Sequence, residues 1–176
     1  MKNLAVCLLL SLLALPVIAQ DSKQDDAMKK CPMHAQHQSH DAVVESHGDQ
    51  AMGFPHEKTT HHFRMLDDGG AIEVAVNDPS DKPNMEAIRS HLSHIEAMFR
   101  SGDFSAPMFI HDGVPPGVTT MKLMKGAIRY GYGDTSTGGK VRLQSMDAVA
   151  VAAIHDFLRF QITEHKTGDS LEVQHK

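Results

Sequence analysis

A twice-repeated pattern of two alternating strands and one amphipathic helix constrains the fold of this chain more than any other feature. Residues 61–66 and 71–76 alternate apolar and polar around the turn signal Asp-Asp-Gly-Gly at 67–70, which predicts a β-hairpin. The following segment carries apolar residues at helical spacing, at Ile88, Leu92, Ile95 and Phe99. Gly102 is then a candidate helix C-cap.

The same order of elements returns later in the chain. Residues 128–132 and 141–143 alternate around a turn at 135–139, and a helix then begins at Ser145 or Asp147 and runs to about residue 166. The two helices align without a gap at an offset of 66 residues, so that Leu92 matches Leu158. The pattern predicts an α+β fold in which two ββα repeats form a four-stranded, mostly antiparallel sheet with both helices on one face.

The repeats divide the chain into parts. We expect them to cover about 59–103 and 125–169 of a domain at 59–176, joined by a long loop at 104–124. Residues 20–58 are rich in His and Met and lack periodicity, which predicts a disordered tail. Residues 1–19 combine a positive start with an apolar run, as in a cleaved secretory signal peptide. We therefore expect a periplasmic or secreted protein that is free of the membrane after cleavage.

Composition directs attention to histidine. The chain has 13 His and 11 Met but only 2 Cys, and its 17 basic and 22 acidic residues give a formal charge of −5. An acidic balance argues against a nucleic-acid partner, because phosphate binding needs a basic face. The sequence contains no His-Glu-x-x-His, Gly-x-Ser-x-Gly, phosphate-binding glycine loop or Cys-x-x-Cys-His motif, which argues against the corresponding enzyme classes and covalent haem attachment.

Comparison of the two repeats identifies candidate metal ligands on the first helix. His91 and His94 are three residues apart, with Met98 four residues further on, and the second helix has Phe157 and Phe160 at the positions of the two histidines. Side chains at i and i+3 are close enough to chelate one metal ion. The alternative is that each histidine is a half-buried, hydrogen-bonded edge residue without a metal.

Further candidates lie on the first strand and in the long loop. Adjacent strand residues point to opposite faces, so His61 shares the face of Phe63 and His62 shares the face of Arg64. His61 is the favoured partner of the helix histidines, with His62 as the alternative, and His111 is the natural fourth ligand. His62 and His111 are equally compatible with solvated polar positions.

The second helix carries two polar residues on its apolar face. Gln161 and His165 occupy the positions of Ile95 and Phe99 in the first helix. We interpret His165 through the helix dipole, which favours a cation at the C-terminal end. On this interpretation His155, His165 and His175 need no metal.

A second group of metal donors precedes the domain. Cys31, Met33 and His34 join a thiolate, a thioether and an imidazole within four residues. The two sulfur donors suit Cu(I), whereas imidazole also accepts Cu(II), zinc, nickel or haem iron. Because Cys7 lies in the signal segment, Cys31 would have no thiol partner within the mature chain.

The Cys-Pro-Met-His run resembles the heavy-metal-binding segments of bacterial copper and silver efflux proteins. The resemblance covers four residues and lacks the later Cys-Pro-x-Cys-Gly part of that pattern. It implies metal capture and a metal-efflux or metalloenzyme-assembly partner. Residues 59–66 and the second helix also look like small uncharacterised exported bacterial proteins, a similarity that assigns no role to any residue.

The sequence thus predicts an exported transition-metal-binding protein, with copper favoured over zinc or nickel, that acts in metal buffering, delivery or resistance. Protonation of its imidazole ligands near pH 6 would weaken binding. One alternative is a haem- or copper-dependent redox protein. Another is a structural or partner-binding domain in which the histidines are incidental.

Overall fold

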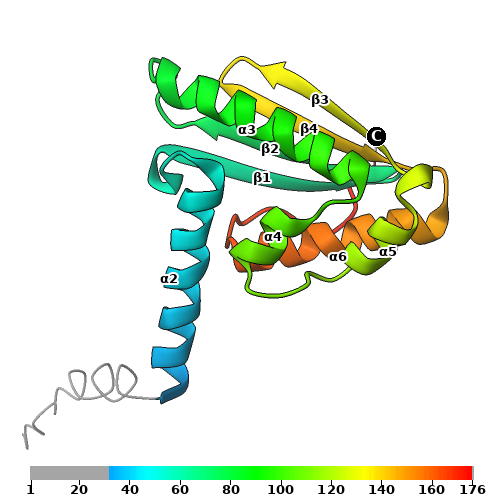
Figure 1. Ribbon diagram of the computed structural model, residues 1–176, viewed down its shortest axis with the longest axis horizontal. Helices are drawn as coiled ribbons and strands as arrows, with labels where there is room; N and C mark the ends of the chain where they lie inside the picture. The colour runs from blue at the N-terminus through cyan, green and yellow to red at the C-terminus, as the bar shows by residue number, and fades with distance from the viewer. Residues whose placement is uncertain (1–31, 176) are drawn as a thin grey trace, which may run out of the picture. The chain divides into compact units, whose positions relative to one another are not determined.

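The fold is an antiparallel sheet with its long helices on one face (Figure 1). This computed structural model describes the backbone of residues 32–175 and the side chains of residues 40–175. The strands β1 (Thr59–Leu66), β2 (Gly69–Val76), β3 (Arg129–Thr135) and β4 (Gly138–Gln144) lie in the order β1-β2-β4-β3, and every neighbouring pair is antiparallel. Each hairpin is followed by a long helix, α3 (Lys82–Ser101) or α6 (Ala148–Glu164). The predicted α+β fold of two ββα repeats is confirmed.

Both long helices begin and end at residues suited to those positions. The Asp81 carboxylate accepts a hydrogen bond from the amide of Asn84, and the Asp147 carboxylate accepts from the amides of Val149 and Ala150. Gly102 ends α3 with a φ of 86°, in the left-handed region that favours glycine. Among the described residues, no helix is long and apolar enough to cross a membrane.

Each long helix covers the hairpin of the other repeat. Helix α6 lies over β1 and β2, and α3 lies over β3 and β4 (Figure 1). A Cβ atom added to Gly70 in β2 would come within 2.1 Å of Leu158 in α6. In the other half, a Cβ added to Gly139 in β4 would lie 3.2 Å from Leu92 in α3. The two glycines therefore allow both helices to approach the same face of the sheet.

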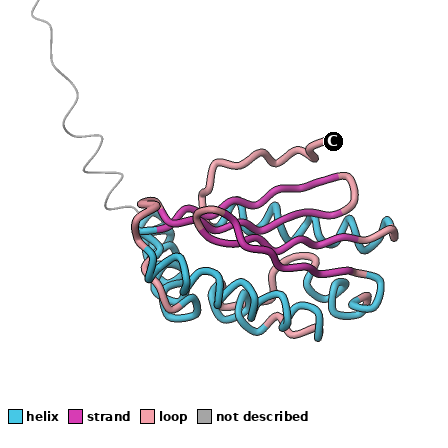
Figure 2. The backbone as a smooth tube through the Cα atoms, turned by 90° about the horizontal axis from the view of Figure 1, so that it is seen from above, coloured by secondary structure: helices cyan, strands magenta, loops and turns pink. Residues whose placement is uncertain are grey.

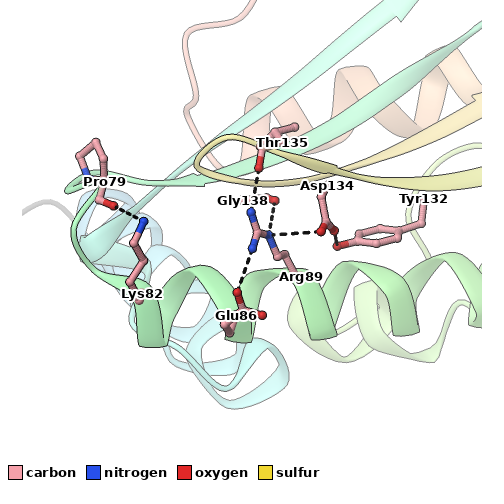
Figure 3. Close-up of polar contacts among 8 residues, drawn as sticks. All are labelled: Pro79, Lys82, Glu86, Arg89, Tyr132, Asp134, Thr135 and Gly138. Carbon is pink, nitrogen blue, oxygen red and sulfur yellow. Dashed lines mark hydrogen bonds and ion pairs between the residues drawn. The ribbon is translucent and has the colours of Figure 1, made fainter.

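Each long helix also forms hydrogen bonds with the hairpin turn of the other repeat. Arg89 in α3 donates hydrogen bonds to the carbonyls of Thr135 and Gly138, at 3.0 and 3.2 Å, beside the turn of the second hairpin (Figure 3). His155 in α6 is 66 residues later, and its Nε2 donates to the carbonyls of Leu66 and Gly69 at 2.9 and 3.0 Å. The two repeats are thus related by an internal two-fold pseudosymmetry and fix each other's turns.

One apolar cluster fills the space between the sheet and the helices. Its completely buried side chains come from both repeats and from the segment that joins them. Burial of a large apolar side chain stabilises a fold by about 1.5–3 kcal/mol. The largest completely buried members are Phe99, Phe104, Phe157, Met65, Ile88, Leu92 and Met121.

The structure has helices where the sequence pattern predicted none. Helix α2 (Pro32–Met52) and the short η1 (His56–Lys58) precede β1, within the segment expected to be disordered. The segment 104–124, expected to be a loop, holds α4 (Ser105–Ile110) and α5 (Val118–Leu123), and η2 (Lys125–Ala127) follows it. These elements are too short, or carry too few apolar residues, for a periodic signal. Val44 and Phe54 are nevertheless buried, so α2 and η1 gain order from tertiary contacts.

The C-terminal segment runs alongside β1 (Figure 2). The amide of Gln174 donates to the carbonyl of Met65 at 2.9 Å. The carboxylate of Asp169 accepts from the amide of Phe63 at 2.9 Å. These bonds satisfy polar groups on an edge strand that would otherwise be open to pairing with another chain.

Strand glycines at contrasting positions test the close packing. A Cβ at Gly138 would come within 2.0 Å of the Val74 carbonyl oxygen, whereas a Cβ at Gly131 would meet nothing within 4 Å. We expect Gly138→Ala to lower the free energy of unfolding by about 2–3 kcal/mol and Gly131→Ala to change it little. Denaturant titration measures both. Equal stabilities of the two variants would contradict the described packing.

Candidate functional site

A small cavity between the sheet and the helices brings together three histidines from distant parts of the chain. His61 comes from β1, His91 from α3 and His165 from the C-terminal end of α6. The cavity has a volume of about 70 Å³. Gln161 and Met52 also line it, and the rest of its wall is apolar. We call His61, His91 and His165 the histidine cluster.

The rings of the cluster lie close to one another and to His111. The centroids of His61 and His165 are 6.2 Å apart, and their planes differ by only 8°. The ring of His111 lies 5.1 Å from that of His165 at an angle of 74°. His91 has its ring edge-on to Phe54, with the centroids 5.7 Å apart. Aromatic rings therefore flank the cluster.

The cluster rings differ from the other described histidines in their hydrogen bonding. Within residues 40–175, no hydrogen bond reaches a ring nitrogen of His61, His91 or His165. His94 has no such bond either, but its side chain is exposed. Seven other rings have protein partners, namely those of His40, His47, His56, His62, His111, His155 and His175. The cluster thus presents ring nitrogens without hydrogen-bond partners beside the cavity.

The internal pseudosymmetry indicates what the fold alone requires at these positions. His61 pairs with Val74 in the first hairpin as Tyr130 pairs with Leu143 in the second. On the helices, His91 and His165 match Phe157 and Phe99. The centroids of Phe99 and Tyr130 are 6.2 Å apart, the same distance as between His165 and His61. Packing at these positions is thus satisfied by aromatic rings without an imidazole.

Burial lowers the pKa of each ring in the cluster. The pKa of His61 falls to about 4, chiefly through burial and further through the neighbouring His91. Burial and then His94 lower the pKa of His91 to about 4. Burial lowers the pKa of His165 to about 3, with His111 and His61 contributing. All three rings are neutral at pH 7, which is the form of imidazole that binds metal ions.

Two of the histidines proposed for the domain site lie in the cavity. His61 and His91 line it, and His61 faces the helices as predicted. His111 is buried beside the cavity, with its Nε2 3.2 Å from Oε1 of Gln161. Met98 is partly buried and packs on the core.

Two other candidates lie apart from the cluster. His62 is on the opposite face of the sheet, where its Nδ1 lies 2.9 Å from the carboxylate of Asp169. His94 is exposed, because the helical rotation places it about 60° further from the core than His91. The prediction that His91 and His94 share a site is therefore not supported by their placement.

The predicted metal ligands in the tail lie outside the residues whose side chains the structure describes. Cys31 precedes the described residues. Met33 and His34 belong to α2, at positions where only the backbone is described. The proposed tail site remains a prediction.

Sequence reasoning missed His165, Gln161 and Met52. The comparison of the helices contained the signal for the first two, because both replace apolar residues on the core face. The helix-dipole interpretation of His165 considered its position along the helix and neglected the face on which it lies. Met52 gave no signal, since it belongs to a segment without periodicity.

A larger cleft adjoins the cavity on the side of α2. The cleft has a volume of about 320 Å³ and shares Met52, His61 and His165 with the cavity. His56 also lines it, as do the acidic residues Asp41, Glu45 and Glu164. The cleft therefore gives the histidine cluster a polar approach that the apolar cavity lacks.

Within the part of the chain that the structure describes, no three His, Cys, Asp or Glu side chains are already arranged to hold a metal ion. Coordination by the cluster would thus require its side chains to move from the positions described. Comparison with known proteins gives no match to a family model, a curated protein or a solved structure.

The lowered pKa values predict how stability changes with pH in the metal-free protein. On unfolding, each cluster histidine regains its ordinary pKa of 6.5, so the unfolded chain binds protons that the folded protein does not. The free energy of unfolding should therefore fall as the pH drops from about 6.5 to about 4. His91→Phe should flatten this dependence, whereas His175→Ala should not. Denaturant titrations across this range would contradict the account if His91→Phe kept the full slope.

Proposed function

We propose that this chain is an exported protein that binds a transition-metal ion through His61, His91 and His165. The observation that carries the proposal is that three neutral imidazoles without hydrogen-bond partners surround a cavity. The corresponding positions of the other repeat hold Tyr and Phe. His61 and His165 also line the adjoining cleft, which gives a metal ion access to them.

Copper is the metal that the donor set favours. Imidazoles bind Cu(II), zinc and nickel, and a thioether adds a preference for Cu(I). Met52 supplies a thioether to both the cavity and the cleft. The tail sequence adds Cys31, Met33 and His34, which would capture the ion before it reaches the cluster. The function would then be metal buffering, delivery or resistance, with a metal-efflux or metalloenzyme-assembly partner.

The cavity argues against haem within it. Pockets for organic ligands measure about 300–1,000 Å³, far more than the 70 Å³ between the cluster rings. A copper-dependent redox role remains consistent with the same ligands. A structural domain with incidental histidines would predict no stoichiometric metal.

Metal binding by the full chain should depend on the cluster. We expect His91→Phe/His165→Phe to weaken copper binding at one site by at least about 100-fold, because two of three ligands are lost. These substitutions install the residues that the other repeat carries, so the core stays filled. The matched control is His94→Phe/His175→Phe, and Cys31→Ser/Met33→Leu/His34→Ala removes the tail donors. Competition titrations with a copper chelator measure the affinities. Loss of binding only in the tail variant would refute the cluster site.

The pH dependence of binding distinguishes the two groups of donors. Ordinary imidazoles lose metal to protons near pH 6, which is the behaviour expected from the sequence. Because the cluster pKa values are about 3 to 4, its affinity should stay nearly constant down to about pH 5 and fall below that. Chelator competition in the tail variant follows the cluster alone. A steep loss of affinity between pH 7 and pH 6 in that variant would contradict the assignment.

A further inference from the structure

The two edge strands of the sheet, β1 and β3, differ in how their outer backbone groups are satisfied. On β1, the amide of Phe63 donates to the carboxylate of Asp169, and the carbonyl of Met65 accepts from the amide of Gln174. Both partners belong to the C-terminal segment of the same chain. The pseudosymmetry of the two hairpins allows the same backbone groups to be located on β3.

The register of the sheet shows which groups of β3 point away from β4. In an antiparallel sheet, the N–H and C=O groups of one residue point to the same neighbouring strand. Phe63 bonds outward, so Ile72 opposite it bonds toward β4, and Val141 opposite Ile72 bonds back toward β2. Tyr132 is opposite Val141 and therefore points outward. The residues two positions to either side of it also point outward, namely Tyr130 and Asp134.

These outward groups of β3 are open within the described chain. Among residues 32–175, no hydrogen bond reaches the backbone N–H or C=O groups of Tyr130, Tyr132 or Asp134. Asp103 matches Asp169 in the repeat, but its carboxylate accepts from the amide of Ser105 at the start of α4. The second hairpin therefore lacks the cap that its own repeat could have supplied.

β3 also lacks the features that keep natural edge strands from pairing. It pairs with β4 over seven residues without a bulge, and it contains neither Pro nor Lys. Its carboxylate, on Asp134, accepts a hydrogen bond from the hydroxyl of Tyr132 and lies 3.7 Å from Nε of Arg89 (Figure 3). The charge on the strand is thus balanced within the same molecule.

We infer that β3 pairs antiparallel with β3 of a second copy of this chain. The outward groups are self-complementary when Tyr132 lies opposite Tyr132 of the other copy, because Tyr130 then lies opposite Asp134 on both sides. Each of these pairs exchanges two hydrogen bonds, so that every outward group of β3 is satisfied. Arg129 lies opposite Thr135 in this register, and no like charges are opposed. The inference is independent of the proposed metal site.

The space around β3 agrees with this pairing. A Cβ atom added to Gly131 or Gly133 would meet nothing within 4 Å, so the outer face of the strand is unobstructed. On the other face, α3 packs on both β3 and β4. Neighbouring strands are about 4.8 Å apart, so the two α3 axes would lie about 10 Å apart, near the usual 8–10 Å of packed helices. The interface would thus join strand pairing with a contact between helices.

The oligomeric state and the exchange of single amides test the inference on the full chain. We expect sedimentation equilibrium to show a dimer. As the dimer forms on concentration, the amides of Tyr130, Tyr132 and Asp134 should exchange with solvent at least about tenfold more slowly. The amides of Gly131 and Gly133 point toward β4 and should be protected at every concentration.

A proline substitution tests the same bonds. Tyr132→Pro removes an outward N–H group and no bond to β4, and edge strands accept proline at such positions. It should weaken dimerisation at least about 30-fold, because the interface contains this position twice and each copy leaves a carbonyl unpaired. Tyr132→Ala keeps the N–H group and is the matched control for loss of the ring.

Three results would overturn the inference. The first is a monomer at every concentration. The second is a dimer in which the outward amides of β3 exchange as fast as in the monomer, because another surface would then form it. The third is equal dimerisation of Tyr132→Pro and Tyr132→Ala. The exchange measurement needs no substitution, so it decides the question even when Tyr132→Pro does not fold.

Discussion

The structure depends on the close contact of each long helix with a glycine in the hairpin of the other repeat. Leu158 meets Gly70 and Leu92 meets Gly139, so each hairpin is covered mainly by the helix of the other repeat. Arg89 and His155 add hydrogen bonds from each helix to the opposite turn. Because each helix packs on the other repeat's hairpin, the start of β1 and the C-terminal end of α6 lie near the middle of α3. The histidine cluster lies where these three segments meet.

The pseudosymmetry also shows which side chains packing requires at matching positions of the two repeats. One half of the fold holds Phe99, Tyr130 and Phe157 in edge-on contacts, and the other half holds imidazoles at those positions. Aromatic rings satisfy the packing in one half, so packing alone does not require imidazoles in the other. The place of these imidazoles beside a cavity and a cleft supports the proposed metal site.

The fold could be predicted from sequence because the strands alternate, the helices are capped and the repeat shows each signal twice. Helix α2 could not be predicted, since Val44, Met52 and Phe54 acquire their role only through contacts with the domain. Two of the three cluster histidines could be predicted from the sequence in the same way. His91 takes the place of a Phe in the other repeat, and His61 is on the core face of its strand. His165 was misinterpreted because the helix dipole alone could explain a histidine at the C-terminal end of α6. Only the tertiary structure brings it to 6.2 Å from His61.

The proposed metal site requires the ring nitrogens of three particular histidines to bind one metal ion. Imidazole ¹⁵N spectra of the full chain, recorded while Cu(I) is added to one equivalent, report on each ring separately. We expect the resonances of His61, His91 and His165 to shift together, while those of His62, His155 and His175 keep the positions set by their protein partners. Shifts confined to histidines before residue 58, with the cluster unchanged at one equivalent, would contradict it.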